Sequence, residues 1–232
     1  MQNVTNTTLI KGVLFDLDGT LLDTAPDMAD ALNAQRAQHQ LAPLPFAVIR
    51  PYVGYGTRAL LKIGFEIDDT HANYQAMAAE YLDLYEQHII KKTAFFPHVE
   101  QVLTELDAAS LPWGIVTNKP KRFAHPLFDA FGLVNRAACL VCGDTLPKRK
   151  PHPDQILYAA AHMQFNTSDL VYVGDTDIDV AASKQANMPA LVALYGYIHA
   201  DENPYAWQAN GYLQSILDII PWLQARRELA HV

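Results

Sequence analysis

The stretch Val13-Leu14-Phe15-Asp16-Leu17-Asp18-Gly19-Thr20 places two carboxylates two residues apart, directly after a short apolar run. Residues i and i+2 of a β-strand share one face, so Asp16 and Asp18 should point the same way where Gly19 breaks the strand. Like charges this close repel by about 4 kcal/mol at an effective dielectric of about 20. A fold keeps such a pair when a cation lies between the charges or when one carboxylate takes a proton. A bound cation and a shared proton are both features of a catalytic or metal-binding site.

The composition excludes several classes of partner. Half of the 232 residues are hydrophobic, 18% are charged, and the formal net charge is −8. This is globular composition, and it contains no cluster of Lys and Arg of the kind that binds nucleic-acid phosphates. A small anionic substrate would need a local positive group, either a metal ion or a lysine, because the overall field repels it.

The expected compartment is the cytoplasm. The first eight residues are polar and uncharged, which is unlike a signal peptide, and no apolar run approaches the roughly 18 residues of a membrane span. Cys139 and Cys142 form a C-x-x-C motif within a strand-like run, where residues i and i+3 point to opposite faces. We therefore expect two structural thiols rather than a redox or zinc site.

Apolar runs that end in Asp, Asn or Gly alternate with helical patterns, which predicts an α/β fold with a Rossmann-like parallel sheet. The expected strands are Leu9–Phe15, Trp113–Val116, Cys139–Val141, Leu170–Val173 and Ala190–Leu194. The expected helices between them are His98–Ala109, Pro120–Phe131, Pro153–His162 and Thr176–Ala186. The interval from Leu22 to about Phe95 is instead helical, notably at Met28–Gln40, Thr57–Lys62 and Ala72–His88. We predict a core of residues 1–22 and 95–232 with an inserted helical cap at 23–94.

The carboxyl ends of the expected strands carry the polar residues that are candidates for chemistry, because ligands of open α/β sheets bind there. These residues are Asp16, Asp18, Thr117, Asn118, Lys150, Asp175 and Asp179. Carboxylates, a hydroxyl and a lysine together predict a magnesium-assisted phosphoryl-transfer site.

We assign roles by position. Asp16 is the nucleophile that attacks phosphorus, and Asp18 is the general acid and base. The metal would be held by Asp16, Asp175 and the backbone carbonyl of Asp18. Thr117, Asn118 and Lys150 would bind phosphoryl oxygens. Asp179, expected one helical turn after Asp175 on the same helix face, would hold Lys150 or a water at the metal.

Four motifs in order identify the chain as a member of the haloacid dehalogenase (HAD) superfamily. They are Asp16-Leu17-Asp18-Gly19-Thr20, Val116-Thr117-Asn118, Lys150-Pro151-His152-Pro153 and Gly174-Asp175-Thr176-Asp177-Ile178-Asp179. The resemblance implies a helical cap after the first motif, a magnesium ion as cofactor, and closure of the cap over the substrate. The dehalogenases of the superfamily lack an acid/base Asp at the position of Asp18, so its presence favours phosphate esters.

A narrower resemblance is to the phosphoglycolate phosphatase group, through Phe15–Thr24 and the cap segment Val53-Gly54-Tyr55-Gly56. The segments Trp113–Pro120 and Tyr195–Trp207 resemble N-acetylmuramic acid 6-phosphate phosphatases. The resemblance implies a hydrolase that cleaves 2-phosphoglycolate or N-acetylmuramic acid 6-phosphate through an aspartyl-phosphate. His98 departs from the family pattern, which usually has Gly there at the junction of cap and core.

Several alternatives stay open. Arg50, Gly54, Gly56 and Arg58 form a substrate-recognition loop or are turn glycines and solvated arginines. For Asp177, the position favours an acid at a helix N-terminus over a metal ligand. The His199–Trp207 loop either lines the entrance to the site or packs on the surface. A sugar phosphate isomerase of the β-phosphoglucomutase type and a non-catalytic binding module are the alternative functions. The oligomeric state, monomer or homodimer, is not determined.

Overall fold

The computed structural model describes residues 9–229, and they form an α/β fold around one six-stranded parallel sheet. The strand order is β5-β4-β1-β6-β7-β8. The strands span Gly12–Phe15 (β1), Trp113–Val116 (β4), Leu140–Val141 (β5), Leu170–Gly174 (β6), Ala190–Ala193 (β7) and Gly211–Leu213 (β8). This confirms the predicted Rossmann-like sheet. The edge strand β8 is an addition that the sequence analysis did not predict.

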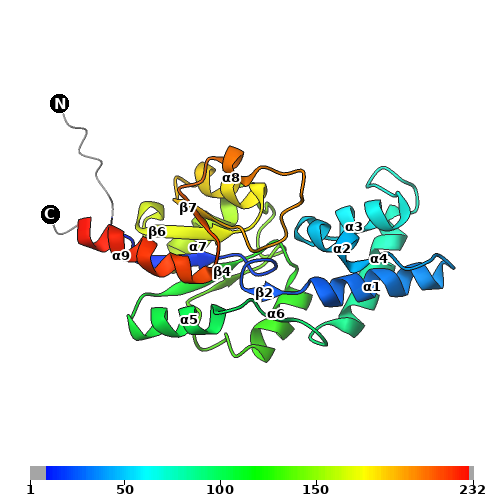
Figure 1. Cartoon of the computed structure of the whole chain (residues 1–232), viewed down its shortest axis with the longest axis horizontal. Coiled ribbons are helices and arrows are strands. Elements are labelled where there is room, and N and C mark those ends of the chain that lie inside the picture. The colour runs from blue at the N-terminus through cyan, green and yellow to red at the C-terminus, as the bar shows by residue number, and fades with distance from the viewer. Residues whose placement is uncertain (1–8, 230–232) are drawn as a thin grey trace.

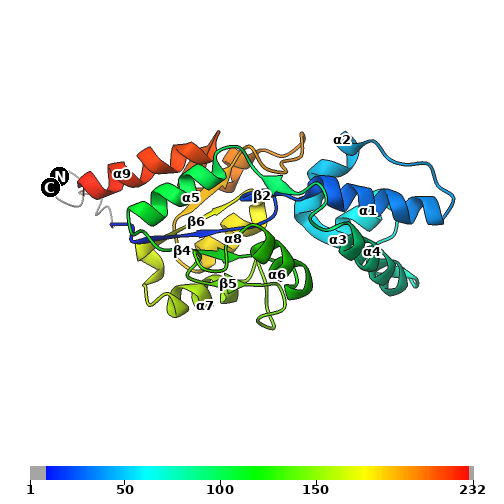
Figure 2. The same ribbon diagram turned by 90° about the horizontal axis from the view of Figure 1, so that it is seen from below.

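The central strand β1 is buried on both faces because helices cover the sheet from both sides (Figure 2). Val13 and Phe15 belong to the hydrophobic cluster that includes residues of α5 and α9, and Leu14 belongs to the opposite cluster with α7 and α8. A strand in this position reads as a continuous apolar run rather than an alternating one. The helices of the core are α5 (Val99–Ala108), α6 (Lys121–Ala130), α7 (Asp154–His162), α8 (Asp177–Gln185) and α9 (Ile219–Leu229).

The helical insertion lies between β2 (Leu22–Asp23) and β3 (Ala94–Phe95), which pair with each other in antiparallel fashion. It contains α1 (Ala25–Gln38), α2 (Phe46–Ile49), the 3-10 helix η1 (Arg50–Tyr55), α3 (Gly56–Phe65) and α4 (Tyr74–His88). These helices gather at the end of the molecule away from α9 (Figure 1). We call this group of helices the cap. The three helices predicted here are present, whereas α2, η1 and the β2–β3 pair are additions, and the domain boundaries at 22/23 and 94/95 stay a prediction.

The departure at His98 has a backbone explanation. His98 precedes α5 as its N-cap residue and adopts a left-handed conformation with φ of 68°. Glycine adopts this conformation without steric cost, whereas other residues pay roughly 1–2 kcal/mol. The Gly that the family pattern has at this position suits the turn, and the exposed His98 occupies the same turn at that cost.

Three further 3-10 helices complete the described chain: η2 (Thr167–Asp169), η3 (Pro204–Trp207) and η4 (Ile216–Asp218). Within residues 9–229, no helix combines the length and the apolar character that crossing a membrane requires.

Candidate active site

The carboxyl ends of β1, β4 and β6 bring the predicted site residues together. Asp16 follows β1, Thr117 follows β4 and Asp175 follows β6, and these three strands are neighbours in the sheet. Lys150 reaches the same place from the loop before α7. Residues far apart in the chain therefore meet at one edge of the sheet, as expected for an open α/β fold.

Lys150 is the centre of a buried polar cluster. Its Nζ lies 2.9 Å from Asp16 Oδ1 and 2.7 Å from Asp179 Oδ1. The same ammonium donates to the Tyr172 hydroxyl at 2.7 Å and to the Val116 carbonyl at 3.1 Å. Three hydrogen-bond acceptors and the ion-paired carboxylate of Asp16 thus surround three N–H groups. A phosphoryl oxygen, the partner predicted for Lys150, would have to replace one of these contacts.

Burial and charge act against each other in this cluster. Burial raises the pKa of the Asp16 carboxyl to about 7, although the Lys150 ammonium acts in the opposite direction. Burial also raises the pKa of Asp175 well above its usual range, and the Asp179 and Asp16 charges add to that effect. For Lys150 itself, burial acts to lower the pKa, but Asp16 and Asp179 outweigh it and the pKa is raised.

The donor set fits a hard divalent cation. Asp16, Asp175 and Asp179 each offer a carboxylate oxygen, and these three oxygens lie within 4.8 Å of one another. All three side chains are buried, and Lys150 is the only lysine in contact with them within the described residues. Excess negative charge on oxygen donors in a buried site is the environment in which magnesium binds. The carboxylate of Asp18 is not part of this group, and the role of its backbone carbonyl as a metal ligand stays a prediction.

Asp175 is held in a tight backbone cradle. The backbone N–H of Tyr197 donates to Asp175 Oδ2 at 2.8 Å, and the Thr20 hydroxyl lies 3.5 Å from Oδ1. A side chain at Gly19 or at Gly196 would collide with Asp175, and Gly19 has a positive φ of 84°. Glycine is therefore required at both positions by the close approach of the backbone to this carboxylate.

Asp179 lies in the site for a reason that differs from the prediction. Asp175 precedes α8, which begins at Asp177, so the two aspartates do not share a helix face and that argument was wrong. Asp179 is instead the third residue of α8, where its Oδ2 accepts from the backbone and hydroxyl of the N-cap residue Thr176 in a capping box. Its Oδ1 accepts from Lys150. One carboxylate thus fixes both the helix start and the lysine.

Asp18 makes contacts of its own, which the sequence analysis missed. Lys119 Nζ donates to Asp18 Oδ1 at 2.8 Å, and the Thr24 hydroxyl donates to the same oxygen. Both Lys119 and Thr24 are buried. The available signal for Lys119 was its place two residues after Thr117, at the carboxyl end of a strand. Lys119 lies within the segment Trp113–Pro120, to which the sequence analysis assigns a resemblance but no role for this lysine.

Thr117 and Asn118 form the turn that follows β4. The Thr117 hydroxyl accepts from the backbone N–H of Lys119 at 3.1 Å. The Asn118 amide donates to the backbone carbonyl of Lys150 at 2.9 Å. Asn118 therefore positions the segment that carries Lys150, and a direct contact between its side chain and a phosphoryl group stays a prediction.

The cap segment Arg50–Gly56 docks on the loop that follows β7. Arg50 donates to the Gly196 carbonyl at 3.0 Å, and its guanidinium lies 4.9 Å from the centre of the Tyr197 ring. The Tyr52 hydroxyl lies 3.2 Å from His199 Nε2. Gly54 faces Thr176 so closely that a Cβ would lie 3.1 Å from its methyl group. The structure thus brings Arg50 and Gly54 to the core side of the cap.

Of the remaining predicted positions, Arg58 and Gly56 lie outside this contact, whereas the Tyr55 hydroxyl of the cap segment lies 3.4 Å from Asp177 Oδ1. Arg58 is exposed and pairs with Asp69 at 3.2 Å, and a side chain at Gly56 would meet no neighbour within 4 Å. Asp177 is exposed in the first turn of α8, where an acid is favourable. Trp207 packs against a small cluster of the core, so the loop from His199 to Trp207 joins a cap contact to a packing contact.

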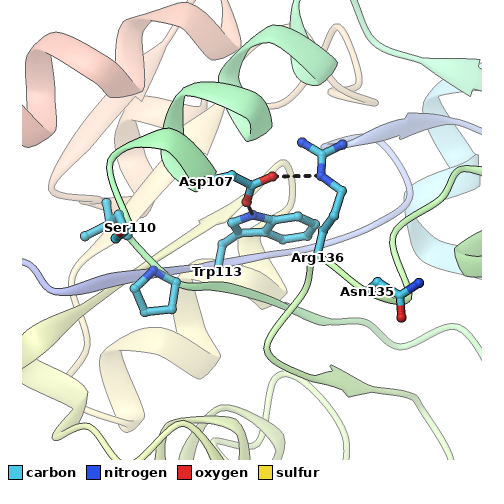
Figure 3. A pocket seen from close by; sticks show the side chains of 7 residues that line it. Asp107, Ser110, Trp113, Asn135 and Arg136 are labelled. Atoms are coloured by element: carbon cyan, nitrogen blue, oxygen red, sulfur yellow. Dashed lines mark hydrogen bonds and ion pairs between the residues drawn. The ribbon is translucent and has the colours of Figure 1, made fainter.

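A hollow at the amino ends of the sheet strands does not belong to this site. It is lined by Asp107, Ser110, Leu111, Pro112, Trp113, Asn135 and Arg136 (Figure 3). Trp113 begins β4, so the hollow lies at the amino end of a strand whose carboxyl end forms the site. Asp107 already accepts hydrogen bonds from both Trp113 Nε1 and Arg136 Nε at 2.8 Å.

The raised pKa of Asp16 predicts a pH-dependent stability. Because the folded-state pKa of about 7 exceeds the ordinary aspartate pKa of 3.8, the folded state binds this proton more tightly than the unfolded chain does. The contribution is therefore present at low pH and is lost as the pH rises towards and through 7. In magnesium-free buffer, Asp16→Asn should gain stability relative to the wild type between pH 5 and pH 8. Urea unfolding of both proteins across this range measures the difference, and a constant difference would contradict the prediction.

Comparison with known proteins shows the family to which the chain belongs. A family model described as haloacid dehalogenase-like hydrolase matches residues 13–193, and the chain belongs to this family. The resemblance drawn from the four motifs is thereby confirmed, as is the prediction that the chain is a hydrolase. A solved structure of a protein described as a predicted phosphoglycolate phosphatase from Haemophilus somnus has the same fold. Its TM-score is 0.81 at 24% identity, over 92% of this chain and 97% of that one.

Relatives with curated names are phosphatases of two kinds. A phosphoglycolate phosphatase of Xylella fastidiosa is 44% identical over 198 residues, which cover 85% of this chain and 86% of the relative. An N-acetylmuramic acid 6-phosphate phosphatase of Pseudomonas aeruginosa is 35% identical over 201 residues, which cover 87% and 89%. These two names are the two groups that the narrower resemblance had indicated.

Proposed function

We propose that the chain is a magnesium-dependent phosphatase that hydrolyses a small phosphorylated metabolite through an aspartyl-phosphate intermediate. The observation that carries this proposal is the buried cluster of Asp16, Lys150 and Asp175 with Asp18 held separately beside it. One carboxylate is available as a nucleophile, and a second has its own hydrogen-bond donors. The relatives named as phosphatases support the same reaction.

The reaction takes two steps. In the first, a carboxylate oxygen of Asp16 attacks phosphorus, the bond from phosphorus to the ester oxygen breaks, and Asp18 gives a proton to the departing alcohol. In the second, water attacks the phosphorus of the aspartyl-phosphate and Asp18 takes a proton from it. Inorganic phosphate leaves and the Asp16 carboxylate is restored. The hydroxyl of Thr117 and the ammonium of Lys150 stabilise the charge that moves onto the phosphoryl oxygens.

The residues that would hold magnesium are Asp16 and Asp175, together with the backbone carbonyl of Asp18. Magnesium, when bound, supplies positive charge that lets an anionic ester approach these carboxylates. Asp179 already binds Lys150 and the start of α8, so we place it behind the metal ligands.

The proposed substrate is 2-phosphoglycolate or N-acetylmuramic acid 6-phosphate, the substrates that the relatives' names state. Both esters carry a carboxylate in addition to the phosphate. Arg50 is suited to bind that carboxylate. Within the described chain, its guanidinium contacts a backbone carbonyl and an aromatic ring but forms no ion pair with an acidic side chain. We place the reaction in the cytoplasm, with a small metabolite rather than nucleic acid or a membrane as the partner.

The test is phosphate release from each ester, measured as kcat/KM with magnesium and again with excess EDTA. We expect release from at least one ester, its loss with EDTA, and its recovery when magnesium is restored. Preference for one ester identifies the substrate. Conversion of a sugar 1-phosphate to a 6-phosphate without net phosphate release would instead establish an isomerase. Tight binding of both esters without turnover would establish a binding module.

A further inference from the structure

Lys119 is a buried cation that the proposed reaction does not yet use. Only 5% of its side chain is exposed, and its partner Asp18 is 15% exposed. Burial acts to lower the pKa of Lys119, but the Asp18 charge outweighs it, so the amine stays an ammonium ion. A buried ion pair is costly to form and is a weak source of stability by itself. Its position beside the proposed acid and base therefore requires a separate explanation.

The two donors around Asp18 act on the same oxygen. Lys119 Nζ donates to Oδ1 at 2.8 Å, and the Thr24 hydroxyl also donates to Oδ1. In the described part of the chain, Oδ2 receives no side-chain or backbone hydrogen bond. An oxygen that already accepts from an ammonium and a hydroxyl is the poorer place for a proton. The two oxygens of this carboxyl group are thus unequal, and Oδ2 is the one left to exchange a proton.

The cap covers this arrangement. Lys119 Nζ lies 4.8 Å from the centre of the Tyr85 ring, which belongs to α4 of the cap. Tyr85 is buried, and among residues 9–229 its hydroxyl makes no hydrogen bond that satisfies the geometric criteria. An aromatic ring next to an ammonium excludes water from it and interacts favourably with its charge. The contact between Lys119 and Asp18 is therefore shielded by the docked cap.

We propose that Lys119 is a positioning residue which, together with Thr24, holds Oδ1 of Asp18 so that Oδ2 delivers the proton to the departing alcohol. As the phosphorus–oxygen bond breaks, its electron pair stays on the ester oxygen and the proton moves from Oδ2 to that oxygen. In the second step, Oδ2 takes the proton from the attacking water. This inference rests on the proposed phosphatase function.

The test compares two leaving groups. Nitrophenolate leaves without a proton, whereas the alcohol of a sugar or glycolate ester needs one. We expect Lys119→Met to lower the single-turnover cleavage of the better of the two natural esters roughly 100-fold, the usual size of a general-acid effect. Release of nitrophenolate from 4-nitrophenyl phosphate should fall by less than about threefold. Lys121→Met is the matched control, because Lys121 is an exposed lysine two residues further along, and it should change neither rate.

A second variant keeps the test independent of folding. Thr24→Val removes the other donor to Oδ1 at nearly constant volume, and it should give the same selective loss at a smaller size. Equal loss for both leaving groups in these variants, or a raised KM with unchanged kcat, would show that Lys119 binds substrate or only supports the fold, and would overturn the inference. Absence of phosphate release by the wild type from any ester would refute the proposed function, and this inference with it.

Discussion

Replacing Asp16 by asparagine should lower phosphate release by about 10⁵-fold or more, because an amide cannot form the aspartyl-phosphate. The variant keeps the size of the side chain and removes the charge that burial disfavours. Loss of activity should therefore occur without loss of folding. The measurement is kcat/KM for the better ester with saturating magnesium, together with urea unfolding at pH 7.5.

The control for this variant is Asp129→Asn, which changes an exposed aspartate of α6. It should retain wild-type kcat/KM. If Asp16→Asn kept activity within tenfold of the wild type, Asp16 would not be the nucleophile. Direct attack of water on the ester would then replace the covalent step.

Replacing Lys150 by methionine should destabilise the protein by about 3–5 kcal/mol, the usual cost of removing one partner from a buried ion pair. Lys150 is 2% exposed in its side chain, as is its partner Asp179. Without the ammonium, the Asp179 carboxylate is left buried beside Asp16 and Asp175 with no compensating charge. Urea unfolding in the presence of EDTA measures the change without a contribution from bound metal.

Two further variants make the prediction specific. Lys148→Met alters an exposed lysine two residues away and should change the free energy of unfolding by less than about 0.5 kcal/mol. The double variant Lys150→Met, Asp179→Asn should recover part of the loss, because it removes the charge that lost its partner. If the two substitutions were simply additive, the ion pair would not be the source of the stability.

Much of the fold could be predicted from the sequence because the strands of the core are buried on both faces. Such strands are apolar runs between polar ends, and β1, β4, β6 and β7 all have this form. The strands β2 and β3 have two residues each and carry no periodicity to detect. β8 has three residues, Gly211 to Leu213, and it forms an edge of the sheet where tertiary pairing rather than local pattern fixes the strand.

The site was predictable where a motif ends a strand and less so elsewhere. Asp16, Thr117 and Asp175 meet because parallel strands share one carboxyl edge, which is a general property of the fold. The contacts of Lys119 with Asp18 and Tyr85 join three separate segments, one of them in the cap, and no local spacing specifies them. For Asp179, the sequence does contain the capping-box pattern, which is Thr176 with an acid three residues later. We interpreted the spacing from Asp175 to Asp179 as a shared helix face instead.

The strand order has a consequence for biosynthesis. β1 pairs with β4 on one side and with β6 on the other, and β6 emerges some 150 residues after β1. At 5–20 residues per second, the nascent chain spends roughly 10–30 seconds with the hydrogen-bonding edge of its first strand unpaired. The helical cap, whose contacts are local, can fold during that interval, whereas the sheet and its acidic centre cannot. Ribosome-bound chains that end before residue 170 should therefore contain folded helices next to an apolar strand that chaperones recognise.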